Sequence, residues 1–177
     1  VAYIGQRGSF SELAAIEYFG KKEELVSKVE FHDVYKSVET QEATYCVIPI
    51  ENSLAGSIHQ NYDLLLKGEL VIVGEIYLKV SHFLLSNKNV SKKNIKKIYS
   101  HPQPLAQCSK FFKKMPHVIQ IPVSSTSAAV KMIKDENMND AAAIASYQAA
   151  IDFDMEILES NIEDDHTNQT RFLVLAK

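Results

Sequence analysis

The chain has few cysteines, no long apolar run and no excess of positive charge, and each shortage excludes a class of protein. Only two of its 177 residues are cysteines, too few for a disulfide framework, which favours a reducing, cytoplasmic setting. No apolar run approaches the roughly 18 residues of a membrane-spanning helix. The net charge of −3 argues against nucleic acid as the main partner, because surfaces that follow phosphates need clustered positive charge. We therefore expect neither a membrane nor a nucleic acid partner.

Motifs for several common kinds of chemistry are also missing. Gly5 and Gly8 are not followed by the third glycine of a dinucleotide-binding fingerprint or by the Gly-Lys-Ser/Thr of a phosphate-binding loop. Ser53 does not lie in a Gly-x-Ser-x-Gly elbow, which argues against an α/β-hydrolase triad. The histidines and cysteines show no metal-like spacing. The sequence therefore predicts no metal and no cofactor.

The sequence does contain a repeated pattern of a short apolar strand, a turn and a helix. The predicted strands are 1–5, 29–31, 44–50, 97–100, 118–123, 156–162 and 170–176. The predicted helices are 9–19, 33–41, 57–66, 102–115 and 125–135. Segment 70–80 is predicted to be one or two strands, and 141–146 a strand or the start of a helix. This alternation argues for an α/β fold with largely parallel sheets, in which ligands bind beyond the carboxyl ends of strands.

Four predicted strand-to-helix junctions carry similar polar residues. Each junction has hydroxyls, amides or glycine before or within the first helical turn. The four junctions are residues 5–11, 51–57, 100–104 and 124–127. Free backbone N–H groups and the helix dipole attract carboxylate or phosphate to such places. Plain N-capping is the alternative, because Ser, Thr and Asn are the preferred capping residues.

The two arginines lie near opposite ends of the chain, and both fall in polar motifs. Arg7 and Arg171 are the only arginines among 19 basic residues. Arginine binds carboxylates with two nitrogens, whereas lysine is a looser point charge. A small dianionic ligand is one inference, and a structural salt bridge explains either arginine about as well. Residues 164–166, Asp-Asp-His, suggest a proton relay or a metal site as alternatives, but we interpret them as part of a hinge loop.

Four segments together resemble the catalytic domain of prephenate dehydratase. They are Gly5-x-x-Gly8-Ser9-Phe10-Ser11, Ile48-Pro49-Ile50-Glu51-Asn52-Ser53-x-x-Gly56, Ser100-His101-Pro102-Gln103-Pro104-Leu105-x-Gln107-Cys108 and Asn168-x-Thr170-Arg171-Phe172. They follow the family's order and spacing and span essentially the whole chain. One departure is Gln6, where the family usually has proline, and this affects turn rigidity more than chemistry.

The resemblance implies two α/β lobes like those of a type II periplasmic binding protein, with mixed, largely parallel sheets and flanking helices. The active site would lie in the cleft between the lobes. Lobe 1 would comprise residues 1–78 and 168–177, and lobe 2 residues 79–167. Members of this family usually self-associate, so a homodimer or larger homo-oligomer is expected. A regulatory ACT domain that binds phenylalanine is expected in the full-length chain, after Lys177.

The resemblance also implies an activity: a cytoplasmic hydro-lyase that converts prephenate to phenylpyruvate, water and carbon dioxide in phenylalanine biosynthesis. Such an enzyme must orient a dianion, stabilise developing charge and help hydroxide leave as water. The alternative is a two-lobed module that binds an organic acid or amino acid without converting it, because fold alone does not determine function.

Site residues are carried over from the matching motifs. Thr170 is implied to hydrogen-bond to the departing ring hydroxyl, either as proton donor or as an orienting group. Asn52 and Gln107 would donate hydrogen bonds to substrate oxygens, and Ser100 would support the same region. Arg171 would hold a carboxylate or brace Thr170. The expected substrate-binding residues are Ser9, Ser11, Ser53, Gly56, His101, Thr126, Arg171 and Phe172.

Overall fold

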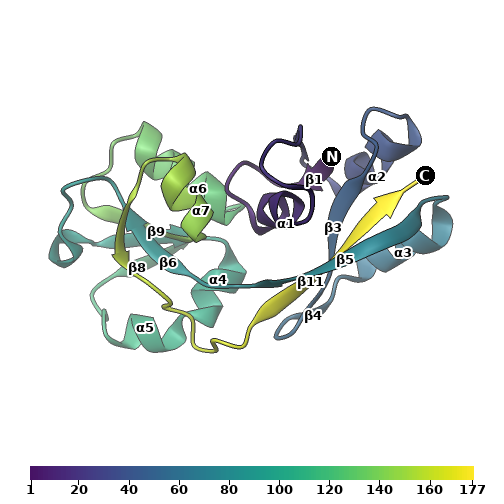
Figure 1. Ribbon diagram of the computed structural model, residues 1–177. Helices are drawn as coiled ribbons and strands as arrows, with labels where there is room; N and C mark the ends of the chain where they lie inside the picture. Colours follow the sequence, from purple (N-terminus) through teal and green to yellow (C-terminus); the bar gives the residue numbers. More distant parts are fainter. The chain divides into compact units, whose positions relative to one another are not determined.

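The computed structural model describes residues 1–177 and divides into two units (Figure 1). Unit 1 comprises Val1–Val80 and Thr167–Lys177, and unit 2 comprises Ser81–His166. The chain therefore passes into unit 2 after Val80 and returns after His166. These crossing points lie close to the boundaries at 78/79 and 167/168 that the resemblance implies.

The sheet of unit 1 mixes parallel and antiparallel strands in the order β2-β1-β3-β11-β5. Strand β1 (Ala2–Ile4) pairs in parallel with β2 (Val26–Lys28) and β3 (Cys46–Asn52). Strand β11 (Gln169–Ala176) runs antiparallel to both β3 and β5 (Val71–Lys79). The strand that carries the Thr-Arg-Phe motif is thus inserted between two others, although it follows all of unit 2 in sequence (Figure 1).

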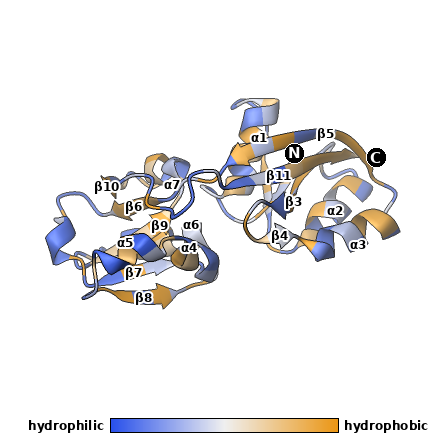
Figure 2. Cartoon of the chain, turned by 90° about the horizontal axis from the view of Figure 1, so that it is seen from below, coloured by the Kyte–Doolittle hydropathy of each residue, from blue (hydrophilic) through white to orange (hydrophobic).

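Helices cover both faces of this sheet. They are α1 (Phe10–Phe19), α2 (Phe31–Glu39) and α3 (His59–Lys67). Side chains alternate between the two faces of a strand. On β11, Phe172 and Val174 therefore join the core cluster under α1, whereas Leu173 and Leu175 join the cluster under α2 and α3. Figure 2 shows hydrophobic and hydrophilic residues alternating around α2 and α3, as expected for helices with one buried face.

The sheet of unit 2 has the order β10-β6-β9-β7-β8. Strand β7 (Lys97–Ser100) is parallel to β8 (Ile119–Pro122) and to β9 (Ala141–Ala145). Strand β6 (Phe83–Ser86) runs antiparallel to β9 and to β10 (Glu156–Glu159). Both units are therefore α/β with mixed sheets, as the resemblance implies. The sheets are not largely parallel, because β11 and β6 each run antiparallel to both of their neighbours.

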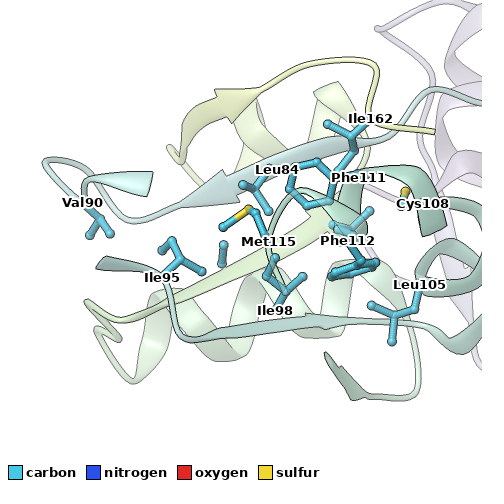
Figure 3. Packing of buried hydrophobic residues seen from close by; sticks show 12 residues of the cluster. Leu84, Val90, Ile95, Ile98, Leu105, Cys108, Phe111, Phe112, Met115 and Ile162 are labelled. Atoms are coloured by element: carbon cyan, nitrogen blue, oxygen red, sulfur yellow. The ribbon is translucent and has the colours of Figure 1, made fainter. Parts of the chain in front are cut away.

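Four α-helices and one 3-10 helix belong to unit 2. They are α4 (Pro102–Gln107), α5 (Ser109–Lys113), α6 (Thr126–Asp135), α7 (Tyr147–Asp152) and the 3-10 helix Lys92–Asn94. Phe111 and Phe112 of α5 pack with Leu84 and Ile98 of the sheet (Figure 3). The opposite face of the sheet packs against α6 and α7 through a separate cluster. No helix of the chain has both the length and the apolar character needed to cross a membrane.

Several elements differ from the sequence-based prediction. Segment 102–115 is broken at Cys108, whose backbone is non-helical, so that α4 and α5 replace one helix. Segment 51–57 is no strand-to-helix junction, because β4 (Gly56–Ser57) pairs back onto β3. Strand β2 lies at 26–28 instead of 29–31. Segment 70–80 contains one strand and 141–146 contains β9, whereas β6 and α7 lie where the sequence predicts no element.

Candidate functional site

Thr170 and Asn52 face each other across the antiparallel pair β11 and β3. Asn52 Nδ2 donates a hydrogen bond to Thr170 Oγ1 at 2.9 Å. Asn52 Oδ1 accepts hydrogen bonds from the backbone N–H groups of Leu54 and Ala55, at 3.1 and 2.9 Å. The two backbone donors fix the orientation of the amide, because its nitrogen could not accept from them. The oxygen of the Thr170 hydroxyl is therefore an acceptor.

The hydroxyl hydrogen of Thr170 has no acceptor within the protein, since the only hydrogen bond of this side chain is the one it accepts. The side chain lies mostly inside the unit, with the residue 9% exposed. A hydroxyl that accepts one hydrogen bond becomes a better donor for the next, because the bonds polarise one another. The hydroxyl hydrogen of Thr170 is thus available for a further hydrogen bond.

Asn168 is a third member of this cluster, and the sequence analysis gave it no role. Its Oδ1 accepts hydrogen bonds from Asn52 Nδ2 at 2.8 Å and from Ser53 Oγ at 3.4 Å. The residue is fully buried, and its Nδ2 has no hydrogen-bond partner. Asn168 precedes Thr170 by two positions, which is the spacing of side chains on one side of an extended chain. A polar residue at this spacing was the signal that could have identified it.

The loop after β3 is joined to the start of β11. Ser53 N donates to Gln169 O at 2.9 Å, and Gln169 N donates to Ser53 Oγ at 3.0 Å. Gly56 has a φ of 82°, a conformation that favours glycine, where the chain turns into β4. The structure therefore places Ser53 and Gly56 in a hairpin beside the Thr170 cluster.

Arg171 follows Thr170 and, by strand alternation, points to the other side of β11. Its Nε and one terminal nitrogen contact Glu75 Oε2 at 2.9 and 2.7 Å, and its guanidinium lies 5.8 Å from the centre of the Tyr77 ring. The hydrogen bond to Glu75 raises the pKa of Arg171. A small cavity of about 200 Å³ on this side is lined by Glu51, Ser53, Tyr77, Gln169 and Arg171. The arginine already has a carboxylate partner, and its binding of a substrate carboxylate stays a prediction.

The other predicted residues of unit 1 lie in the local framework. Ser9 caps α1, because its Oγ accepts from the N–H of Glu12 at 3.3 Å, as the sequence predicts. The Glu12 carboxylate in turn accepts from Gly8 N at 2.6 Å. Ser11 is buried in the first turn of α1, and Phe172 is 1% exposed within the core. Phe172, which is expected to bind substrate, therefore lies in the core of unit 1 and does not reach its surface.

Gln107 stands at the end of α4, directly before the break at Cys108. Its Oε1 lies 2.9 Å from Nε2 of His82, and its backbone oxygen accepts from Asp164 N at 2.7 Å. Burial lowers the pKa of His82, although the Gln107 hydrogen bond and the Glu163 charge oppose this. A neutral His82 protonated on Nε2 donates to Oε1 and leaves the amide hydrogens of Gln107 for other acceptors.

Residues 163 and 164 hold this region in place. Glu163 accepts from His82 N at 2.8 Å and from the His166 ring at 3.0 Å. Burial alone would raise the pKa of Glu163, but these hydrogen bonds hold it below its ordinary value. Asp164 accepts from the backbone N–H groups of Ser109 and Lys110, at 2.9 and 2.8 Å, and so caps α5. The predicted hinge loop thus anchors the helix break beside Gln107.

Three further predicted residues of unit 2 take part in local hydrogen bonds or lie beside them. Ser100 is fully buried, and its Oγ donates to Ile144 O at 2.7 Å. His101 caps α4, because its Nδ1 accepts from Gln103 N at 3.3 Å. Thr126 is the first residue of α6, whose capping residue is Ser125. Ser100, His101 and Gln107 therefore lie along one continuous segment from β7 through α4.

The side chains give no metal-binding cluster of the usual type. No group of three or more His, Cys, Asp or Glu is placed to hold a metal ion. Both cysteines are buried and free, and burial raises the pKa of each thiol to about 12. Neither thiol is therefore ionised near neutral pH.

All 177 residues, 1–177, match the sequence model of the family described as "Prephenate dehydratase". The chain belongs to the prephenate dehydratase family. The resemblance carried by the four motif segments is thereby confirmed. A relative from Arabidopsis thaliana, "Arogenate dehydratase/prephenate dehydratase 2, chloroplastic", is 45% identical over 100% of this chain and 46% of its own length. The chain spans less than half the length of the curated relatives it matches.

Solved structures agree with the family assignment. A prephenate dehydratase from Arthrobacter aurescens, in complex with L-Phe, superposes with a TM-score of 0.92 at 25% identity, covering 100% of this chain and 60% of that one. A protein titled "GqqA- a novel type of quorum quenching acylases" superposes with a TM-score of 0.90 at 28% identity, covering 99% and 63%. The predicted α/β fold of prephenate dehydratases is confirmed. The acylase shows that function must still be argued from the site.

Proposed function

We propose that this chain catalyses the decarboxylative dehydration of prephenate to phenylpyruvate, as a hydro-lyase of phenylalanine biosynthesis. The observation that carries the proposal is the Thr170 hydroxyl, which accepts from Asn52 and has its own hydrogen available. Membership of the prephenate dehydratase family over residues 1–177 supplies the substrate class. The names of the relatives support the same chemistry.

The reaction needs a hydrogen-bond donor at the leaving oxygen. When the bond between the ring and its carboxylate breaks, carbon dioxide departs and the electron pair of that bond moves into the ring. This pair expels the hydroxyl oxygen, so the carbon–oxygen bond breaks with its own electron pair on oxygen, and the ring becomes aromatic as it breaks. One proton from solvent completes the water. We assign the hydrogen bond to this oxygen to Thr170, because its hydroxyl is oriented as a donor. A donor placed where charge develops stabilises the transition state more than the ground state.

Asn52 acts on the substrate through Thr170 in this proposal. The sequence analysis expected Asn52 to donate directly to substrate oxygens. Both of its amide hydrogens point towards protein acceptors, however, and its oxygen holds the loop after β3. We therefore assign Asn52 an orienting role. We assign the direct hydrogen bond to a substrate oxygen to the amide nitrogen of Gln107, whose amide oxygen is held by His82. Ser100 supports β7, and Arg171 braces β11 through Glu75.

The full protein carries further proposals. We propose a homodimer or larger homo-oligomer. We also propose a phenylalanine-binding ACT domain in the full-length protein, which the greater length of the relatives supports. We propose the cytoplasm as its compartment, in keeping with two buried free thiols, although some relatives are named chloroplastic.

The test is an assay with purified protein and prephenate, in which phenylpyruvate is read by its absorbance in alkali. Arogenate is assayed in parallel, with phenylalanine as the product, because a relative is named for both substrates. Turnover of prephenate that disappears in Thr170→Ala supports the proposal. Binding of prephenate by calorimetry without any product would instead support the non-catalytic binding module.

A further inference from the structure

The amide of Asn52 has two hydrogens and a defined use for each. Nδ2 lies 2.8 Å from Asn168 Oδ1 and 2.9 Å from Thr170 Oγ1, and the carbonyl oxygen of Gln169 is a more distant third acceptor at 3.3 Å. An amide nitrogen directs its two hydrogens in fixed, diverging directions. The acceptor at Asn168 therefore determines where the second hydrogen points.

Asn168 itself is held rigidly. Its side chain is fully buried, and its backbone oxygen accepts from Val80 N at 2.9 Å. Ser53 Oγ gives its Oδ1 a second, longer hydrogen bond of 3.4 Å. A fully buried acceptor whose backbone and oxygen are both hydrogen-bonded is suited to orient a neighbouring amide.

The two ends of the Asn168 amide differ, because Oδ1 accepts hydrogen bonds whereas Nδ2 makes none. Nδ2 is buried without a hydrogen-bond partner, and most buried polar groups in folded proteins have one. An apolar residue of the same size would avoid this cost but would lose the oxygen. The oxygen, as a neutral acceptor, is therefore the functional part of the residue.

We propose that Asn168 is a positioning residue for the dehydration, which acts through Asn52 to hold the Thr170 hydroxyl in its donating orientation. The inference rests on the proposed function of Thr170. Without the oxygen of Asn168, the remaining acceptor for this hydrogen of Asn52 is Gln169 O at 3.3 Å, and the Nδ2 end of the amide shifts towards it while Oδ1 stays bonded to Leu54 and Ala55. Thr170 then loses its donor and its fixed orientation. The effect is therefore on turnover rather than on substrate binding.

The first experiment compares Asn168→Leu with a matched control, Asn61→Leu. Asn61 is also fully buried in unit 1, also has one atom without a partner, and donates from Nδ2 to Pro49 O at 2.7 Å. Asn168→Leu is expected to lower kcat by roughly 10- to 100-fold with little change in KM, because small misplacements of reacting groups have effects of this size. Asn61→Leu is expected to lower Tm and leave kcat unchanged. Equal losses of kcat in both variants would overturn the proposal.

The second experiment is a double-mutant cycle with Thr170→Ala. Because Asn168 acts only through Thr170, Asn168→Leu is expected to cause no further loss of kcat when residue 170 is alanine. A loss of the same factor in both backgrounds means that Asn168 acts independently of Thr170, which contradicts the inference. Asn168→Asp keeps an acceptor oxygen and is expected to retain more kcat than Asn168→Leu. If the leucine variant does not fold, Asn168→Ala takes its place in the cycle.

A third measurement separates this inference from the proposed function. The side-chain amide hydrogens of Asn52 are observed by NMR, as their exchange protection, which needs no turnover. Protection is expected in the wild type and in Asn61→Leu, and its loss in Asn168→Leu. If the wild type converts neither prephenate nor arogenate, the proposed function fails while this contact is still measured. Unchanged protection in Asn168→Leu would remove the basis of the positioning role, whatever the activity.

Discussion

Asn52 Nδ2 donates to Thr170 Oγ1 at 2.9 Å, across 118 positions of sequence. This contact brings two separate motifs of the prephenate dehydratase family into one hydrogen-bonded cluster. It also sets the donor and acceptor roles of the Thr170 hydroxyl, because its oxygen accepts from the amide and its own hydrogen remains to be donated.

The first prediction concerns the hydroxyl of Thr170. Thr170→Ala is expected to lower kcat for prephenate by roughly 10²- to 10⁴-fold, the usual contribution of a positioned proton-transfer group, while the circular dichroism spectrum stays unchanged. Thr170→Ser keeps the hydroxyl and is expected to retain most of the activity. Near-normal turnover by the alanine variant would remove Thr170 from the mechanism.

The second prediction concerns the direction of the same hydrogen bond. Asn52→Asp keeps the oxygen that holds the loop but replaces the donating nitrogen by an acceptor. Thr170 would then donate to the carboxylate, and its hydrogen would no longer be available for the proposed bond to substrate. A severe loss of kcat is expected in steady-state kinetics. Asn52→Asp with wild-type kcat would show that the direction of this bond has no role in turnover.

The third prediction concerns pH and stability. Because folding lowers the pKa of His82 below 6.5, the unfolded chain binds this proton at a higher pH than the folded chain. The free energy of unfolding that depends on a neutral His82 is therefore fully present above about pH 6.5. It is lost as the pH falls below that value towards the lowered pKa of the folded chain. The lowered pKa of Glu163 adds a further loss once the pH falls below 4.5.

Denaturant titrations at several pH values check this expectation. His82→Gln is expected to flatten the decline in unfolding free energy just below pH 6.5. The matched control is His59→Gln, because His59 is exposed on α3. A decline of the same size in His82→Gln and in the wild type would assign it to other groups.

The fourth prediction resolves the two roles left open for Arg171. If Arg171 braces β11 through Glu75, then Arg171→Leu and Glu75→Leu have similar, small effects on Tm, and both leave KM for prephenate nearly unchanged. If Arg171 binds a substrate carboxylate, only Arg171→Leu raises KM strongly. Steady-state kinetics and thermal unfolding of the two variants distinguish the alternatives, and we expect the first.

Sequence reasoning succeeded where local rules decide the structure. Ser9 and Ser125 were both predicted to lie at the starts of helices, and both cap their helices as expected. These features depend on residues within one helical turn. The motif segments themselves were also visible without any structure, because each is contiguous.

It failed where distant residues decide. The break at Cys108 is stabilised by Asp164, whose side chain caps α5 from 55 positions away. The hairpin after Asn52 is joined to Gln169, and the role of Asn168 is visible only once β11 lies beside β3. Hydrophobic periodicity contains no information about such pairings.

The central place of β11 sets the order in which unit 1 is completed during protein synthesis. Strands β3 and β5 leave the ribosome before any residue of unit 2, yet the strand that joins them follows all of unit 2. The first 80 residues therefore wait with two unpaired strand edges, and pairings this far apart in sequence form slowly. A nascent chain that stops before β11 has no Thr170 and lacks the strand that joins β3 to β5, so we expect unit 1 to remain incomplete until β11 is made.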